Sequence, residues 1–389
     1  MSDQYIVFAI FLIFSGAAVL ATFALFTRQS MLVAYILLGA LLGPWGLKVF
    51  GQPQFIQNVG DIGIIFLLFL LGLHLPPQKL YNMLKKITWV GLISSALFAL
   101  VGYGVAWVSG FSAMECLIVG LAMMFSSTII GIKLLPTTIL HHQHTGEVMI
   151  SVLLFQDIIA IVVLLALQAI SGKGVLWRDL TMVAVGFPVM TVVAFLFEKY
   201  ILRRLFSRFS RIKEYMFLLA IAWCLALAEL AAKLGLSAEV GAFIAGVSLA
   251  TSPVSMYIAE SLKPVRDFFL VMFFFAVGAS FNLNYLPKVL LPAVVIVIIL
   301  LALKPVAYKL LLRWVGESKQ VAWEVGVRLA QISEFSLIIA YVGLETKIIT
   351  PTAGYLIEAA AILSFIISSY WVVMRYPTPI AMSDRMRRD

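Results

Sequence analysis

Asp157 is the residue whose chemistry stands out, because it is a single carboxylate inside the apolar run SVLLFQDIIAIVVLL at 151–165. Its neighbour Gln156 adds an amide, and no Lys, Arg or His lies within eight residues on either side. If the run crosses a bilayer, a charge near its middle costs roughly 2.5–3.5 kcal/mol on insertion scales. That cost is accepted where an acid lines a wet cavity and functions there; the alternative is a neutral Asp hydrogen-bonded between helices. The working hypothesis is that a cation and a proton compete for Asp157.

The composition indicates that this carboxylate belongs to an integral membrane protein. Of the 389 residues, 62% are hydrophobic and 12% are charged, with a mean hydropathy of +1.05, whereas soluble domains carry about 25% charged residues. Apolar runs of about 20 residues recur along the chain, which predicts helices rather than a barrel. Cys116 and Cys224 lie in or beside such runs, so no disulfide framework is expected. An intramembrane enzyme is not expected either, because neither a catalytic carboxylate pair with a matching Gly motif nor an HExxH helix is present.

Breaks marked by Pro, Gly and charge clusters divide the chain into about thirteen membrane spans. They are predicted at about 5–26, 31–49, 55–74, 87–108, 113–135, 148–170, 176–197, 214–234, 237–250, 265–281, 286–312, 321–343 and 352–374. Most of the 28 lysines and arginines fall in alternate loops, which predicts an outside N-terminus and an inside C-terminus. The stretch 199–213 is the most basic loop, and we expect it to contact anionic lipid headgroups of the bilayer rather than nucleic acid. No cleavable signal peptide is evident, and the expected location is a bacterial-type cytoplasmic (inner) membrane.

Thirteen spans also divide into six, one and six, so that the second half starts on the opposite side of the membrane, as an inverted repeat requires. Two spans carry polar interruptions at matching positions about 200 residues apart. The interrupting residues are Ser126, Ser127 and Thr128 in the fifth span and Gln331, Ser333 and Glu334 in the twelfth. This pairing predicts broken helices whose backbone groups and half-helix dipoles meet at the midplane. The alternative is that Ser and Thr merely bond back to the preceding turn.

The motifs, in this order and at this spacing, resemble those of the Kef-type potassium/proton antiporters, within the second family of monovalent cation/proton antiporters. The resemblance covers nearly the whole chain. It rests on GALLGPW at 39–45, GDIG at 60–63, FLLFLLGL at 66–73, SST at 126–128, LFQD at 154–157, GAFIAG at 241–246 and FFFAVG at 273–278.

The resemblance implies an all-α integral membrane fold like that of the sodium/proton antiporters. It would have about thirteen transmembrane helices, inverted six-span repeats and two broken, crossing helices, and it would form a homodimer. Transport would be an elevator-like slide of a core against a dimerisation scaffold. The implied divisions are a transmembrane antiporter domain at 1–374, with scaffold spans at about 5–74 and 214–281 and core spans at about 87–170 and 286–374, and a short basic cytoplasmic tail at 375–389.

The resemblance also makes Asp157 the ion-binding carboxylate, with Gln156 where electrogenic sodium relatives have a second Asp and electroneutral ones typically have Asn. No cofactor is expected in this chain; the transported ions are H⁺ and K⁺ or Na⁺. Suitable oxygen ligands for the ion are Asp157, the Gln156 amide, freed backbone carbonyls and the hydroxyls of Ser126, Ser127 or Thr128. Potassium is cheaper to dehydrate than sodium, so a looser, amide-bearing site favours K⁺. A gated cation channel is the competing class of function.

Lys304 precedes Pro305 in the eleventh span and resembles the membrane lysine of the sodium antiporters, which can pair with the ion-binding Asp. The alternative is that Lys304 snorkels to the cytoplasmic edge. Glu334, two turns after Arg328, is expected either to tie the end of a half-helix or to have a secondary functional role. Glu115 and Asp61 lie near predicted span ends and are expected to face interfacial water.

Three departures from the Kef pattern affect regulation. The sequence ends at Asp389 without a Gly-rich βαβ fingerprint, so a nucleotide-binding regulatory domain would have to come from a separate subunit. The loop 251–263 lacks the acidic run of glutathione-gated members, and His74 stands where the family more often has Glu. Three further histidines, at 141, 142 and 144, predict a solvated loop, with pH sensing as the alternative.

Overall fold

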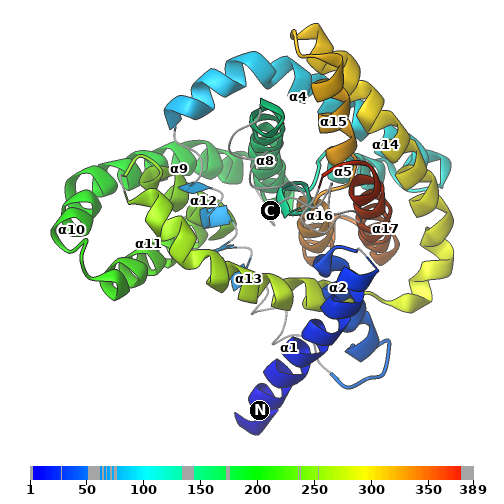
Figure 1. Cartoon of the computed structure of the whole chain (residues 1–389), viewed down its shortest axis with the longest axis horizontal. Helices are drawn as coiled ribbons and strands as arrows, with labels where there is room; N and C mark the ends of the chain where they lie inside the picture. The colour runs from blue at the N-terminus through cyan, green and yellow to red at the C-terminus, as the bar shows by residue number, and fades with distance from the viewer. Residues whose placement is uncertain are drawn as a thin grey trace. The chain divides into compact units, whose positions relative to one another are not determined.

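The computed structural model describes residues 3–27, 29–50, 77–133, 144–171, 176–234, 238–252 and 254–377, together with 62, 63, 65, 66, 68–70, 72, 73 and 236. Within these residues the regular elements are helices, and none is a β-strand (Figure 1). Seven of the described helices are long and apolar enough to cross a membrane, and three shorter apolar helices accompany them. The chain is therefore an all-helical, multi-pass membrane protein.

The helices follow one another with few residues between them. They are α1 Asp3–Phe26, α2 Met31–Leu42, α4 Pro77–Val108, α5 Ala113–Met123, α6 Thr128–Lys133, α8 His144–Ser171, α9 Leu176–Phe197, α10 Arg203–Arg208, α11 Lys213–Lys233, α12 Ala238–Leu249, α13 Ser255–Ser280, α14 Leu286–Trp314, α15 Lys319–Arg328, α16 Glu334–Glu345 and α17 Pro351–Arg375. A π-helical turn, Glu198–Leu202, joins α9 to α10, and a 3₁₀ turn, Leu283–Tyr285, precedes α14. Twelve of the predicted spans coincide with a helix or with two half-helices. The third predicted span lies mostly outside the described residues.

Several span boundaries differ from the prediction for reasons of backbone chemistry. α2 ends at Leu42 rather than near residue 49, because the backbone of Gly43 turns to an extended conformation with ψ 178°. α13 begins at Ser255 rather than 265, and Pro264 lies inside it. A proline inside a helix removes one backbone hydrogen bond, but in a membrane helix neighbouring groups can replace that bond. Pro264 therefore does not mark the start of α13.

The chain forms two compact units. The first contains Met1–Gly51, Met83–Leu164 and Val277–Asp389, and the second contains Gln52–Asn82 and Leu165–Ala276. In the first unit α14 packs against both α15 and α17, and α16 packs against α5 and α17. In the second, α12 packs against α11 and α9. These units place α1 and α2 with helices of the predicted core; the scaffold and core division concerns motion and stays a prediction.

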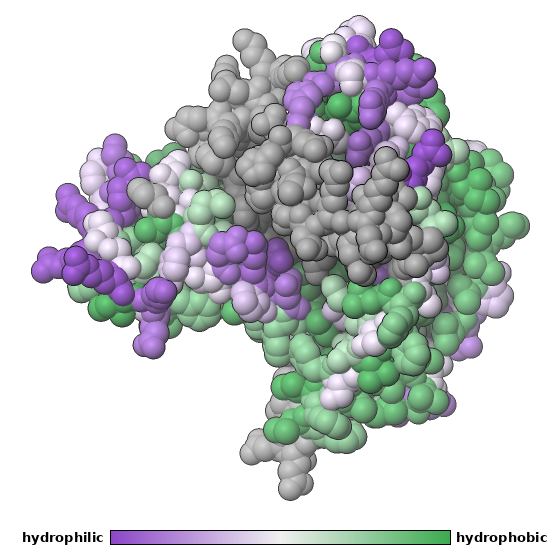
Figure 2. All heavy atoms as spheres, in the orientation of Figure 1, coloured by the Kyte–Doolittle hydropathy of each residue, from purple (hydrophilic) through white to green (hydrophobic). Residues whose placement is uncertain are grey.

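The outward face of α14 is apolar. Leu291, Ile298 and Leu310 are exposed by 74%, 61% and 63%, as a lipid-facing helix requires. Figure 2 shows hydrophobic side chains over this flank and hydrophilic ones gathered where α14 gives way to α15. This change from apolar to polar surface is typical of a helix that leaves the membrane.

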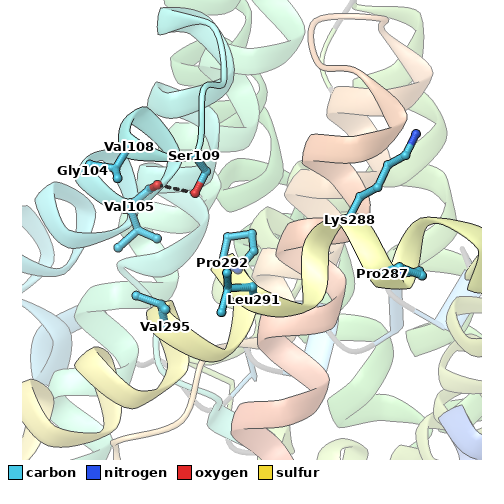
Figure 3. A pocket seen from close by; sticks show the side chains of 9 residues that line it. All are labelled: Gly104, Val105, Val108, Ser109, Pro287, Lys288, Leu291, Pro292 and Val295. Atoms are coloured by element: carbon cyan, nitrogen blue, oxygen red, sulfur yellow. Dashed lines mark hydrogen bonds between the residues drawn. The ribbon is translucent and has the colours of Figure 1, made fainter.

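A pocket of about 680 Å³ lies between α4 and α14 and is lined mainly by apolar groups (Figure 3). The Ser109 hydroxyl donates to the Val105 carbonyl at 2.8 Å, and the Lys288 ammonium points away from the pocket. The pocket thus presents few polar ligands, and its chemistry does not suit a monovalent cation.

Gly326 lets α15 approach α14 closely. A Cβ at this position would lie 2.8 Å from Pro305 Cα and 2.8 Å from Pro305 O, which are both backbone atoms. Gly326→Ala is therefore expected to force the helices apart and to cost about 1–3 kcal/mol of stability. The measurement is the thermal unfolding midpoint of the purified protein in detergent. Gly104→Ala on α4 is the matched control, since an added Cβ there meets no atom within 4 Å; equal midpoints for the two variants would contradict this account of the α14–α15 contact.

Candidate ion-binding site

The fifth span is interrupted as predicted. α5 ends at Met123 and α6 begins at Thr128, and the residues between them leave the helical conformation. Ser126 and Ser127 are buried there, with exposures of 1% and 0%. The Ser127 hydroxyl accepts a hydrogen bond from the Ile130 N–H at 3.1 Å. Ser127 thus caps the start of the second half-helix, because an N-terminal N–H has no partner within its own helix.

The twelfth span is interrupted in the same way between Arg328, the last residue of α15, and Glu334, the first of α16. Ser333 caps α16 by accepting a hydrogen bond from the Phe335 N–H at 3.1 Å. α17 satisfies the freed groups of this segment: the Ile332 N–H donates to Ser364 Oγ, and Ser368 Oγ donates to Gln331 Oε1, both at 3.0 Å. Serines spaced along α17 therefore hold the interruption in place.

The two interruptions lie against each other, and Lys304 of α14 joins them. Its Nζ donates to Phe125 O at 2.7 Å and to Gln331 O at 2.9 Å, which are carbonyls that follow α5 and α15. A third bond, at 3.3 Å, goes to Ser126 Oγ. Gln331 Nε2 adds a direct link to Ser127 O at 3.3 Å. Because helix C-termini carry partial negative charge, the ammonium lies where both half-helix dipoles favour a cation.

Neither sequence interpretation of Lys304 describes this geometry. Lys304 is 0% exposed, so it does not snorkel to the membrane edge. Within the described residues its hydrogen bonds go to the interruptions, and none goes to Asp157. The Phe98 ring lies 5.2 Å from Nζ and adds a cation–π contact. Sequence reasoning singled out Lys304 but did not identify what the lysine contacts.

Asp157 lies on α8 beside the start of α6 and is 1% exposed. The Thr128 hydroxyl donates to the carboxylate, at 3.2 Å from Oδ1 and 3.3 Å from Oδ2. Thr128 is the one hydrogen-bond donor that the described residues provide to this group. The carboxylate of Glu334, at the start of the other second half-helix, is near enough to repel it. A buried carboxylate with one donor has lone pairs left for a metal cation or a proton.

Gln156 holds the fifth-span interruption with its whole amide group. Oε1 accepts from the Ser126 N–H at 3.0 Å, and Nε2 donates to Met124 O at 3.2 Å and to Tyr308 Oη at 2.8 Å. One lone pair of Oε1 remains for an ion. Sequence reasoning missed Tyr308, although it follows Lys304 by four residues and so shares its face of α14.

Other polar residues identified in the sequence have local structural roles. Glu115 does not face interfacial water as expected: it is 7% exposed, belongs to a capping box with Ser112 and accepts from the Thr350 N–H at 3.1 Å. Lys233 and Glu229 form an exposed pair at 3.5 Å on the surface of α11. Arg328 donates to Glu324 Oε1 at 2.9 Å and to the Pro377 carbonyl at 3.1 Å.

The three histidines at 141, 142 and 144 are described only in part. His144 Nε2 lies 2.6 Å from Glu317 Oε2, so the first residue of α8 contacts the loop between α14 and α15. His141, His142, His74 and Asp61 lie outside the described residues. Elsewhere in the described chain, no group of three or more His, Cys, Asp or Glu side chains is placed to hold a metal ion. Both cysteines, Cys116 and Cys224, are buried and free.

Membrane-crossing helices, two facing interruptions and a buried carboxylate beside a half-helix start form an arrangement typical of secondary ion transporters. The chain belongs to the sodium/hydrogen exchanger family, because the model of that family's transmembrane region matches residues 10–374. This family is one of ion transporters and not of enzymes.

Similarity to individual proteins agrees with this family. The chain is 29% identical over 325 residues to K(+) efflux antiporter 5 from Arabidopsis thaliana, which covers 80% of this chain and 56% of that protein. The chain thus spans about half the length of this relative. Its fold is similar to that of the sodium proton antiporter MjNhaP1 from Methanocaldococcus jannaschii, with a TM-score of 0.73 at 19% identity over 95% of this chain and 97% of that one. The predicted sodium/proton antiporter-like fold is confirmed.

Tyr308→Phe tests the anchoring of Gln156. The variant removes the hydroxyl that accepts from Nε2 and leaves a buried amide hydrogen without its acceptor, which costs about 1–3 kcal/mol. We expect a lower unfolding midpoint in detergent. Tyr103→Phe is the control, because the Tyr103 ring stacks on Trp107 with ring centroids 6.2 Å apart, and its hydroxyl is not a partner of Gln156. A midpoint equal to that of the control would show that the hydroxyl does not anchor the amide.

Lys304→Met tests whether the ammonium joins the two interruptions. The variant keeps the length of the side chain and leaves the acceptors Phe125 O and Gln331 O without their donor. Destabilisation of about 1–3 kcal/mol or more is expected, measured by thermal unfolding in detergent. Lys309→Met is the control on the same helix. The Lys309 ammonium lies 5.4 Å from the centre of the Trp323 ring, and its removal should change the midpoint little. The proposed link is wrong if both lysines contribute equally.

Proposed function

We propose that this protein exchanges a monovalent cation, K⁺ in preference to Na⁺, for H⁺ across the membrane, and that Asp157 binds the two ions in turn. The observation that carries the proposal is the state of Asp157. It is 1% exposed, close to a second carboxylate, and has a single hydroxyl donor among the described residues. A buried charge with so few partners is costly, and binding of either positive ion removes that cost.

Competition for one carboxylate gives exchange. A proton on Asp157 forms a neutral acid, and a bound cation forms a neutral ion pair, whereas the empty carboxylate is a bare charge that cannot cross the membrane core cheaply. Asp157 can therefore move from one side of the membrane to the other only with a proton or a cation bound. The repulsion from Glu334 makes the empty state still less favourable, which gives Glu334 a secondary functional role.

The ligands of the cation follow from which oxygens retain capacity. Thr128 Oγ1 and both carboxylate oxygens of Asp157 lie together, and Gln156 Oε1 keeps one lone pair. Ser126 and Ser127 contribute mainly by holding the interruption, since their hydroxyls accept from Lys304 and from the Ile130 N–H. Gln331 and Ser333 have the same holding role in the twelfth span.

Support for K⁺ over Na⁺ comes from two sources. The Gln156 amide beside Asp157 adds no second negative charge, so the site attracts cations less strongly. Such a site suits K⁺, which is cheaper to dehydrate than Na⁺. The named relative is a K(+) efflux antiporter, while the similar structure is of a sodium proton antiporter, so Na⁺/H⁺ exchange is the alternative substrate choice.

The wider arrangement belongs to the same proposal. The antiporter domain comprises 1–374 and the cytoplasmic tail 375–389. The protein forms a homodimer in a bacterial-type inner membrane, with its N-terminus outside, its C-terminus inside and its halves related as inverted repeats. The core slides as an elevator against the scaffold, and a separate nucleotide-binding subunit supplies regulation.

Exchange by purified protein in liposomes loaded with a pH-sensitive dye tests the proposal. Addition of K⁺ is expected to collapse an imposed pH gradient faster than addition of Na⁺, Li⁺ or Rb⁺. Asp157→Asn should abolish the response to every ion, because an amide cannot carry the charge. Asp267→Asn is the control, since Asp267 is half-exposed and bonds to the neighbouring Arg266 at 2.9 Å.

Two outcomes would overturn this function. Full-rate exchange by the Asp157→Asn variant would exclude Asp157 as the shared site. Large K⁺ currents without coupled proton movement would identify the competing gated channel instead of an antiporter.

A further inference from the structure

Glu358 is a second buried carboxyl that the site around Asp157 does not use. It lies on α17 and is 7% exposed, and its Oε2 atom has no hydrogen-bond partner among the described residues. Sequence reasoning did not single it out. Its burial shows that the side chain faces the protein interior.

Along the axis of α17, Glu358 lies between two points at which hydrogen bonds tie this part of the chain to neighbouring segments. Ser364, which bonds the twelfth-span interruption, lies about 9 Å further along the helix axis at 1.5 Å per residue. In the other direction, Thr350 precedes the helix and bonds Glu115 at the start of α5. Glu358 therefore lies between the level of the interruptions and the end of the unit where α17 begins.

No described cation compensates Glu358. α17 packs against α2, α5, α14, α15 and α16. The charged groups of these helices are engaged elsewhere or exposed: Glu115 with Thr350, Lys304 with the interruptions, Arg328 with Glu324, Glu334 beside Asp157, Lys288 over Tyr285, Lys309 over Trp323, and Arg313, Lys319 and Glu345 at the surface. The titratable neighbour whose charge would reach Glu358 is Tyr355, one turn earlier.

Tyr355 also fixes the face of α17 on which Glu358 lies. Its ring packs on Phe281 at 5.4 Å and on Tyr285 at 4.9 Å, and its hydroxyl donates to Ser280 O at 3.5 Å. Glu358 follows it by three residues and so lies on the same side of the helix. This side is turned toward the segment that leads from α13 into α14.

The chemistry of the position favours a proton over a metal cation. A cation site needs several ligands, and within the described chain no group of three or more His, Cys, Asp or Glu side chains is placed to supply them. An ionised carboxylate here would be an uncompensated buried charge, whereas a neutral acid avoids that cost. We propose that Glu358 is a second proton-binding site of this transporter, separate from Asp157. This role rests on the proposed antiport function: Glu358 takes up and releases its proton as water gains and loses access to its carboxyl group during transport.

Infrared spectroscopy tests the protonation state without relying on transport. In the full chain reconstituted in lipid at neutral pH, the carbonyl stretch of a protonated carboxylic acid is expected in the wild type and in Asp157→Asn. Glu358→Gln should remove part of that band, Glu358→Asp should retain an acid band, and Glu345→Gln, at an exposed position of α16, should leave the band unchanged. An unchanged band in Glu358→Gln would show that Glu358 is ionised and would overturn the proposal.

The pH profile of cation-driven proton movement tests whether the site takes part in transport. Glu358→Gln mimics the protonated acid, so its rate should match the wild type at acidic pH and diverge as the pH rises and Glu358 of the wild type releases its proton. Glu345→Gln should follow the wild type throughout. Superimposed profiles for Glu358→Gln and the wild type at all pH values would overturn the role in transport. Failure of the antiport function itself would be seen separately, as unimpaired exchange by Asp157→Asn.

Discussion

The contact of one buried ammonium with the carbonyl ends of two interrupted helices is the interaction on which this unit depends. Interrupting a helix leaves backbone N–H and C=O groups without intrahelical partners, and no water in a bilayer core can satisfy them. Lys304 supplies donors to the carbonyls of both interruptions, and Gln156, Gln331 and the serines of α17 satisfy further groups. Without these side chains, the two interrupted segments would present unpaired backbone N–H and C=O groups to the protein interior.

The same geometry sorts the charges of the site. The ammonium of Lys304 lies at helix C-terminal ends, while Asp157 and Glu334 lie at the N-terminal starts of α6 and α16. Each charge thus meets the helix dipole that favours it. With all three groups ionised, two negative charges face one positive charge, and the site carries a net charge of −1. Addition of one positive charge would bring this sum to zero, which agrees with the proposed binding of one monovalent cation or one proton.

Sequence patterns predicted the elements better than the contacts. Polar residues inside apolar runs located both interruptions, because few other arrangements tolerate exposed backbone at membrane depth. The partners of Lys304 were not predictable, since periodicity gives the face of a helix but not which carbonyls a second interruption brings there. Tyr308 and Glu358 were missed for a related reason: their importance lies in buried neighbours that are distant in sequence. Glu115 was misjudged because a carboxylate near a span end is ordinarily a surface group, whereas this one caps α5 and bonds the segment before α17.

The presence of an amide at position 156 follows from the hydrogen bonds rather than from the ion. Gln156 accepts from the Ser126 N–H and also donates to Met124 O and Tyr308 Oη. An ionised carboxylate in its place can only accept, so the buried Met124 carbonyl would lose its donor while a second negative charge entered the site. The amide therefore meets the backbone requirements of the interruption without changing its own charge. In the proposed exchange, the change in charge is then left to Asp157, which has the Thr128 hydroxyl as its one donor among the described residues.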